Sequence, residues 1–422
     1  MIEQSLPTED EVQSTPLLKS RLPYQLIHDD ASLLTLCDQL TRTNFAIAID
    51  AERASGFRYG QRAYLVQIAI AGQGIYLIDP VAPYSKEVWL SFTREVSSKP
   101  WIIHAASQDI PCLAEIGMTP SQILDTELGS RILGLPRVSL GTITEHYLGL
   151  KLAKEHSAVD WSERPLRQEW LDYAALDVDV LHELWTFVEL DLEKQEKLDI
   201  AREEFQFLID QPAKPAKTDR WRSITGLHEI KDARSLTIAK AMWEAREELA
   251  IEKDIAPGRL IPDLSIIAAV KALPKTKPEL ASLKSFTGRA SRTFIDIWWA
   301  AFSLGNTTKT LLELRPKATG IPNHRNWPVK FPAAHARLTV SKERISALSE
   351  ELRIPAENIL SPDTLRAICF EPPEELSPHS IAEFLHFKHA RQWQIAAVVS
   401  LLLDSLQTVA LETKEKSQNS EE

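Results

Sequence analysis

Short apolar runs rich in β-branched residues alternate with longer stretches of helical periodicity between about residues 25 and 210. Four runs, residues 44–50, 63–70, 75–79 and 101–104, predict β-strands. The first three follow one another across short glycine-containing turns, and helical stretches separate the later ones. This pattern predicts an α/β domain whose sheet begins as a three-stranded meander and is mixed.

Strand patterns stop after a segment of proline, alanine and lysine at residues 210–218, which we interpret as a linker. Beyond it, the periodicity predicts only helices, in two groups separated by a proline-rich and basic connector at residues 315–327. The predicted organisation is a flexible lead (1–23), the α/β domain (24–211), two helical domains (218–304 and 328–408) and a disordered tail (409–422).

The two helical domains share a local pattern. In each, a long helix is followed by a short segment, Ile255–Pro257 or Ile354–Ala356, and then by a Pro-Asp pair that ends at Asp263 or Asp363. We therefore predict two copies of one small helical module.

Charge is distributed unevenly along the chain. The formal net charge is −11, with residues 1–213 at −15, residues 214–344 at +11 and residues 345–422 at −7. A basic middle region is suited to neutralising phosphate groups, although a solvated helical surface has the same composition.

The three cysteines are far apart and none lies in a C-x-x-C motif, so neither a disulfide framework nor a thiolate zinc site is indicated. The first residues are acidic rather than basic and apolar, which argues against a secretory signal. No apolar run approaches the roughly 18–20 residues of a membrane span. We expect a cytoplasmic protein that does not interact with membranes.

Carboxylates mark a candidate site in the α/β domain. Asp50 and Glu52, two residues apart where the first strand ends, project on one face. Carboxylates this close repel each other unless a cation lies between them, and Mg²⁺ or Mn²⁺ prefers such oxygen ligands. The alternative is a pair of solvated charges at a strand end.

Two further segments carry candidate residues. Tyr173 and Asp177, four residues apart in a helix predicted over residues 166–192, share one helix face. Asp109 lies in the first turn of a helix that follows a strand. Tyr173 and Asp177 also fit an ordinary amphipathic helix, and Asp109 also fits a helix-capping role.

The order of these motifs strongly resembles that of the ribonuclease D family: Asp-x-Glu, then His-Ala-Ala-x-x-Asp ending at Asp109, then Tyr-x-x-x-Asp ending at Asp177. Leu124–Thr126 and residues 154–166 add to the similarity. The segment beginning at Trp221 is similar to the helicase-and-ribonuclease-D C-terminal (HRDC) module, and the second helical domain resembles the additional module of longer relatives.

This resemblance implies a ribonuclease-H-like 3′–5′ exonuclease fold. It implies that Asp50, Glu52, Asp109 and Asp177 hold two divalent ions, Mg²⁺ or Mn²⁺, and that Tyr173 orients the attacking water. The implied reaction releases nucleoside 5′-monophosphates from single-stranded 3′ ends of structured RNA such as transfer-RNA precursors. A DNA-directed exonuclease and a catalytically silent nucleic-acid-binding scaffold are the alternatives, and we expect a monomer.

Contacts to the nucleic acid are expected from a smaller group of residues. Basic side chains near Trp221 suit phosphate contact and base stacking, and a buried tryptophan with solvated charges accounts for them equally well. The candidates near Trp221 are Lys217, Arg220 and Arg222. The α/β domain adds Lys154 for the phosphate backbone and His104 near the terminal ribose, and for His104 a hydrogen-bonded structural role is the alternative.

Overall fold

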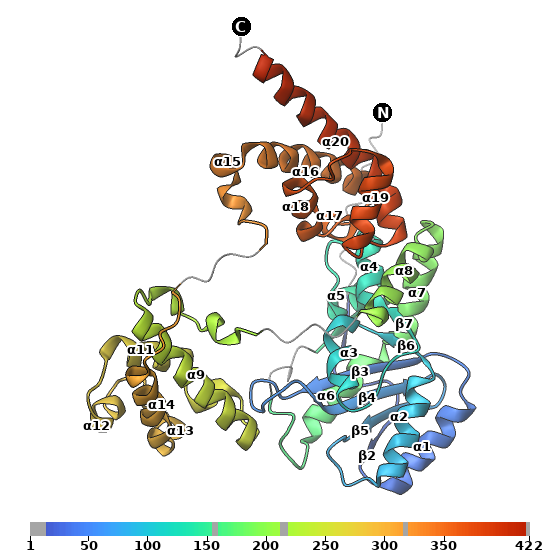
Figure 1. Ribbon diagram of the computed structural model, residues 1–422. Coiled ribbons are helices and arrows are strands. Elements are labelled where there is room, and N and C mark those ends of the chain that lie inside the picture. The colour runs from blue at the N-terminus through green and yellow to red at the C-terminus, as the bar shows by residue number, and fades with distance from the viewer. Residues whose placement is uncertain (1–13, 154–158, 212–217, 315–319, 419–422) are drawn as a thin grey trace, which may run out of the picture.

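The protein is described by a computed structural model covering residues 14–153, 159–211, 218–314 and 320–418 (Figure 1). An α/β domain is followed by two helical units. We call them the first helical module, residues 220–307, and the second helical module, residues 324–418. Figure 1 shows the second module above the α/β domain and the first module to its side.

A six-stranded mixed sheet forms the centre of the α/β domain, with strand order β2-β5-β4-β3-β6-β7. Strands β3, β4 and β5 pair antiparallel, whereas β2, β6 and β7 each join a neighbour in parallel. The strands are β2 Tyr24–Ile27, β3 Ile47–Arg53, β4 Ala63–Ile70, β5 Gly74–Ile78, β6 Pro100–Ile103 and β7 Gln122–Asp125. The predicted meander and mixed sheet are therefore confirmed.

Eight helices accompany this sheet in the described part of the domain. They are α1 Asp30–Arg42, α2 Lys86–Ser97, α3 Ala106–Ala114, α4 Thr126–Ile132, α5 Leu140–Leu148, α6 Gln168–Asp179, α7 Leu181–Lys194 and α8 Leu198–Asp210. The single helix predicted over residues 166–192 was wrong, because the chain forms two helices, α6 and α7, that meet at Val180.

The predicted lead is partly structured. Residues 15–17 form β1 (Thr15–Leu17), which pairs in parallel with β8 (Leu150–Leu152). Arg21 also contacts the α/β domain, where its guanidinium lies 3.0 Å from the Asp179 carboxylate. Asp179 is buried, so our expectation of a flexible lead up to residue 23 does not hold for residues 15–21.

The helical modules repeat one pattern. The first contains α9 Ala233–Lys253, α10 Pro257–Leu260, α11 Asp263–Ala272, α12 Lys277–Ala281, α13 Arg289–Thr293 and α14 Ile295–Thr307. The second contains α15 Trp327–Lys330, α16 Pro332–Leu352, α17 Ala356–Ile359, α18 Pro362–Phe370, α19 Pro378–Phe387 and α20 Gln392–Gln418. Both have a 21-residue helix followed by a four-residue helix.

The residue after the long helix is left-handed in both modules, with φ of 49° at Asp254 and 51° at Arg353. The same chain reversal at equivalent points agrees with the predicted duplication. Short 3₁₀ helices precede the long helices at Arg220–Ser223, Leu227–Glu229 and His324–Asn326.

The two modules attach to the α/β domain differently. Buried residues of the second module, such as Ile359 and Leu402, belong to the same hydrophobic core as the α/β domain. The first module has a core of its own, around residues such as Met242 and Trp298. It contacts the α/β domain through the loop between β3 and β4, where Ala256 N–H donates to the Phe57 carbonyl at 2.9 Å.

Helix α20 differs from expectation in two ways. It continues to Gln418, so the segment predicted as a disordered tail from residue 409 is helical as far as that residue. Residues Gln392–Leu411 are also long and apolar enough to span a membrane by length and composition alone, with a mean hydropathy of 1.6. Val398, Leu402 and Leu406 are buried core residues, and 33% of the apolar window is buried within the protein.

Candidate active site

The central strand β3 carries two carboxylates on one face. Asp50 pairs with Gln67 of β4, and Glu52 pairs with Leu65. We expected the strand to end at Asp50. It continues to Arg53 because the ladder to β4 persists past Glu52, with an irregularity at Arg53. Both carboxylates are thus held on the β4 ladder, and β3 also pairs with β6 through Ile47 and Ala48, just before Asp50.

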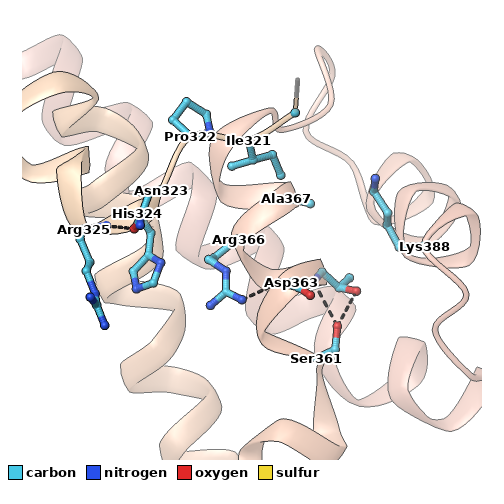
Figure 2. Close-up of a pocket in the computed structure, with 12 residues that line it drawn as sticks. Ile321, Pro322, Asn323, His324, Arg325, Ser361, Asp363, Arg366, Ala367 and Lys388 are labelled. Carbon is cyan, nitrogen blue, oxygen red and sulfur yellow. Dashed lines mark hydrogen bonds and ion pairs between the residues drawn. The ribbon is translucent and has the colours of Figure 1, made fainter. Parts of the chain in front are cut away.

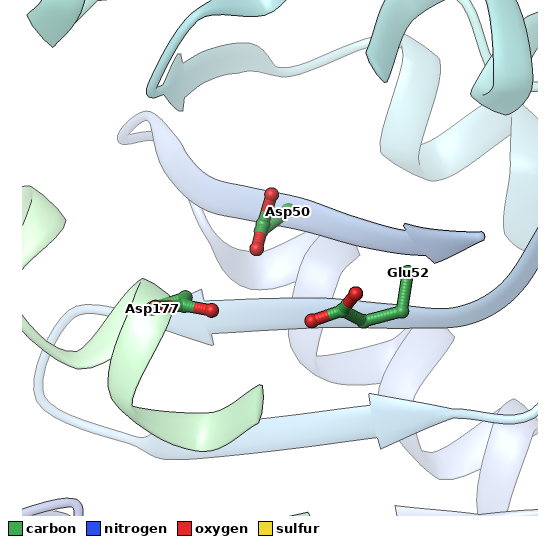
Figure 3. Close-up of side chains that lie close together, drawn as sticks. All are labelled: Asp50, Glu52 and Asp177. Atoms are coloured by element: carbon green, nitrogen blue, oxygen red, sulfur yellow. The ribbon is translucent and has the colours of Figure 1, made fainter. Parts of the chain in front are cut away.

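Helix α6 brings the third carboxylate to this face. The helix packs against β3, β4 and β5, and Asp177 lies near its carboxyl end. One oxygen each of Asp50, Glu52 and Asp177 lies within 4.8 Å of the others, and Figure 3 shows the three side chains converging. Tyr173, one helical turn before Asp177, forms a side-chain hydrogen bond with it.

The cluster is electrostatically unfavourable without a cation. Burial raises the pKa of Asp50 to about 6. Burial, followed by the negative charges of Asp50, Asp177 and Asp109, raises the pKa of Glu52 well above its ordinary value. Burial and the Asp50 charge also raise the pKa of Asp177, which the Tyr173 hydrogen bond opposes. A set of oxygen donors whose mutual repulsion is only partly compensated, by Arg53, suits a divalent cation.

Asp109 lies beside this cluster rather than in it. It is a buried residue of α3, which packs against β3. Burial and the Asp50 charge raise its pKa to about 8, although Arg53 acts in the opposite direction. An Arg53 guanidinium nitrogen lies 3.9 Å from an Asp109 oxygen, and another donates to the Gln108 carbonyl at 3.1 Å.

Asp125, at the end of β7, positions α3. Its carboxylate accepts hydrogen bonds from the backbone N–H groups of Ala105 and Ala106 at 3.0 and 2.9 Å. It also accepts from Glu127 and Leu128 and so caps α4. Ala105 has a left-handed φ of 60°, which is unfavourable for a residue with a Cβ. The two hydrogen bonds that Asp125 accepts stabilise this backbone conformation.

Sequence reasoning had not assigned a role to Asp125 or Arg53. For Asp125 the available signal was its residue type, because aspartate is common at helix N-caps. That signal predicts capping of α4 only. The cap on α3 depends on β6 and β7 lying side by side, which the local sequence does not specify.

The residues expected to contact nucleic acid are dispersed. His104 Nδ1 lies 3.0 Å from Thr126 Oγ1, and burial lowers its pKa to about 4. Arg220 pairs with Glu247 at 3.3 Å, while Arg222 stacks over the Trp221 ring at 4.3 Å and donates to the Glu313 carbonyl. Lys154 and Lys217 lie outside the described residues.

Comparisons with known proteins agree with this architecture. Residues 24–193 match a 3′-5′ exonuclease family, residues 235–301 the HRDC domain, and residues 320–406 a 3′ to 5′ exonuclease C-terminal domain. A crystal structure of a protein from Bifidobacterium adolescentis superposes with a TM-score of 0.84 at 33% identity, covering 93% of this chain and 100% of that one.

Two of the similar proteins are named as ribonuclease D. The crystal structure of Escherichia coli RNase D has the same fold, with a TM-score of 0.65 at 23% identity, covering 92% of this chain and 99% of that one. Ribonuclease D of Granulibacter bethesdensis is 30% identical over 369 residues, which are 84% of this chain and 88% of that protein. The chain therefore belongs to the ribonuclease D family and is a 3′–5′ exoribonuclease.

Proposed function

We propose that the chain hydrolyses the terminal phosphodiester of RNA 3′ ends at the Asp50, Glu52 and Asp177 cluster, with two divalent cations bound, and releases nucleoside 5′-monophosphates. The observation that supports this most directly is the convergence of three half-buried carboxylates within 4.8 Å. When bound, Mg²⁺ or Mn²⁺ would help to ionise water and stabilise charge on the leaving 3′ oxygen.

The chain's own residues have distinct roles in this proposal. Asp50, Glu52 and Asp177 hold the cations, and Asp109 adds a fourth carboxylate from α3 on the Asp50 side of the cluster. Tyr173 donates its hydroxyl hydrogen bond to Asp177, so its phenol oxygen lies where it can orient a water beside the cluster. The raised pKa of Tyr173, caused first by burial and then by the Asp177 charge, keeps the phenol protonated as a donor.

Arg53 contributes a positive charge beside the acids. Because its guanidinium lies 3.9 Å from Asp109, it partly compensates that carboxylate before a cation binds. We expect Asp109 to exchange this long ion pair for cation ligation once the site is loaded.

For the substrate, we propose the 3′ ends of structured RNA such as transfer-RNA precursors, with the chain acting in the cytoplasm as a monomer. The E. coli relative is described as an exoribonuclease involved in structured RNA processing, which supports this class of substrate. Matched single strands of RNA and DNA, digested side by side, test the choice of RNA.

Two single substitutions test the catalytic assignment. Asp50→Asn and Asp177→Asn each keep the shape of the side chain and remove one charge from the cluster. We expect hydrolysis to fall by a factor on the order of 10³ or more, since several kcal/mol of transition-state stabilisation depend on the loaded site. Binding of the RNA in chelator should be unchanged.

Glu87→Gln is the matched control, because Glu87 is an exposed carboxylate of α2. Wild-type turnover by Asp50→Asn or Asp177→Asn, measured by release of mononucleotides, contradicts the assignment. A parallel loss in Glu87→Gln would point to a general effect of charge.

A further inference from the structure

A large open cleft lies in the second helical module, away from the carboxylates (Figure 2). Its volume is about 1040 Å³. Residues 320–325 form one wall, the amino-terminal half of α18 forms another, and Lys388 after α19 closes the third side. Most lining residues are polar or charged, unlike the largely apolar lining of small-molecule sites.

Four basic side chains surround this cleft: His324, Arg325, Arg366 and Lys388. The lining contains one carboxylate, Asp363, which is exposed and pairs with Arg366. Within the described ranges, neither Arg325 nor Lys388 has a carboxylate within ion-pair distance. The cleft therefore carries excess positive charge.

The environment of His324 reflects this excess. Burial and the positive charges of Arg366, Lys342 and Arg325 all lower the pKa of the His324 imidazole. Three neighbouring cations thus act on one ring. An anion entering the cleft would be attracted by all of them.

An exposed aromatic ring adjoins the charges. Phe387 is 74% exposed, although it ends a helix in which Ile381 and Leu385 are buried. Lys388 Nζ lies 5.3 Å from the centre of the Phe387 ring. An exposed aromatic ring beside basic side chains is typical of surfaces that bind single-stranded nucleic acid, since bases stack on the ring while phosphates meet the charges.

We propose that this cleft binds the phosphodiester backbone of the substrate RNA, through Arg325, Arg366 and Lys388, with a base stacked on Phe387. This proposal rests on the proposed function, because it takes RNA as the substrate. It assigns an RNA contact to the second helical module, which contains none of the active-site carboxylates. Strands long enough to reach from the α/β domain to the second module then gain affinity that short ones lack.

The double variant Arg325→Gln/Lys388→Gln tests the charges. Both residues are exposed, so their substitution leaves the core intact. Affinity is measured in chelator, so that no RNA is digested, for single strands of about 24 nucleotides and about 3 nucleotides over a range of salt concentrations. Arg42→Gln/Arg94→Gln is the matched control, because it removes two exposed charges from α1 and α2.

For the cleft variant, we expect roughly tenfold weaker binding of the long strand at low salt. The log–log salt slope should fall by about 1.4, or about 0.7 for each lost phosphate contact. Binding of the short strand and the behaviour of the control should stay at wild-type values. Equal losses in the cleft variant and the control, or no loss in either, overturn the proposal.

Phe387→Ala tests the stacking separately. It should weaken long-strand binding by about tenfold while leaving the salt slope unchanged, because no charge is removed. Unchanged affinity would remove the base contact from the proposal.

Hydrolysis of both strands in the presence of Mg²⁺ distinguishes this inference from the proposed function. If wild-type chain digests neither strand, the catalytic assignment fails, whatever the binding data show. If wild type and the cleft variant digest the short strand equally and also bind the long strand equally, only the cleft proposal fails.

Discussion

At the scale of single residues, protonation of the buried Asp109 carboxyl makes the free energy of unfolding depend on pH. Its pKa is raised to about 8 by burial and by Asp50, so the folded chain keeps a proton that the unfolded chain has lost. Stability from this group is present at low pH and is lost as pH rises through 8. We expect the metal-free unfolding free energy to fall by about 2 kcal/mol between about pH 6.5 and pH 8.5.

Urea unfolding in chelator at these two pH values measures the effect. The window lies above the range in which His104, whose pKa is lowered to about 4 by burial, changes stability. Asp109→Asn should reduce the dependence, with the remainder coming from Glu52 and Asp177, whose pKa is also raised, and Glu87→Gln should leave it unchanged. A divalent cation at about 100 times its dissociation constant should add about 2.7 kcal/mol, more clearly at pH 8.5. Equal pH dependence in Asp109→Asn and wild type would contradict this account.

Sequence periodicity was sufficient to place Asp50 with Glu52 and Tyr173 with Asp177, because each pair depends only on the geometry of one strand or one helix. The convergence of the two pairs was expected only from the family resemblance. The neutralising contact between Arg53 and Asp109 was not predicted, since it joins β3 to α3 and depends on a guanidinium 3.9 Å from its partner.

At the scale of elements, helices α9 and α14 of the first module approach each other closely at Gly305. A Cβ added there would lie 2.6 Å from the Ile238 Cα and 3.1 Å from its nitrogen, both backbone atoms that cannot move aside. We expect Gly305→Ala to lower the unfolding free energy of the first module by about 1–3 kcal/mol.

Hydrogen exchange of peptides from α9 and α14 measures this loss in the full chain. Peptides from β3 should keep their protection, because the first module has its own core. Gly258→Ala is the matched control, since a Cβ at that position of α10 meets nothing within 4 Å. Unchanged protection of α9 in Gly305→Ala would show that the helices separate at little cost.

Element types were predicted well where apolar runs were long and regular, as in β4, where every residue is buried. The break at Val180 was missed because apolar residues lie on both sides of it, with Val178 before Asp179 and Val180 and Leu181 after it. Strands β1 and β8, of three residues each, are too short for periodicity to reveal, and they form only by pairing with each other.

At the scale of the whole molecule, the position of the second module was beyond sequence reasoning. It depends on Arg391, between α19 and α20, which forms two bonds of 2.6 and 2.7 Å to Glu204 of α8, 187 residues earlier. Trp393 Nε1 also donates to Glu204 at 2.8 Å. Periodicity identifies which helix faces are apolar, but it does not indicate which other unit each face meets.

We expect the ion pair between Arg391 and Glu204 to hold the second module against α8. Glu204 is only 4% exposed, so Arg391→Ala would leave a buried carboxylate without its cation. We expect the change to cost about 3–5 kcal/mol and to loosen the second module from α8. Arg391→Lys should cost less, because it keeps the charge but loses the paired geometry. Hydrogen exchange of α8 and α20 and small-angle scattering of the full chain report the loosening.

The double variant Arg391→Ala/Glu204→Gln separates charge from packing. Glutamine keeps an oxygen that can accept the Trp393 hydrogen bond and needs no counter-ion, so the double variant should recover part of the stability lost in Arg391→Ala. If the cost were only the lost contact between the guanidinium and the Phe207 ring, 4.2 Å away, Glu204→Gln would restore nothing. Recovery therefore implies that an unpaired buried charge, rather than lost packing, is what releases the module.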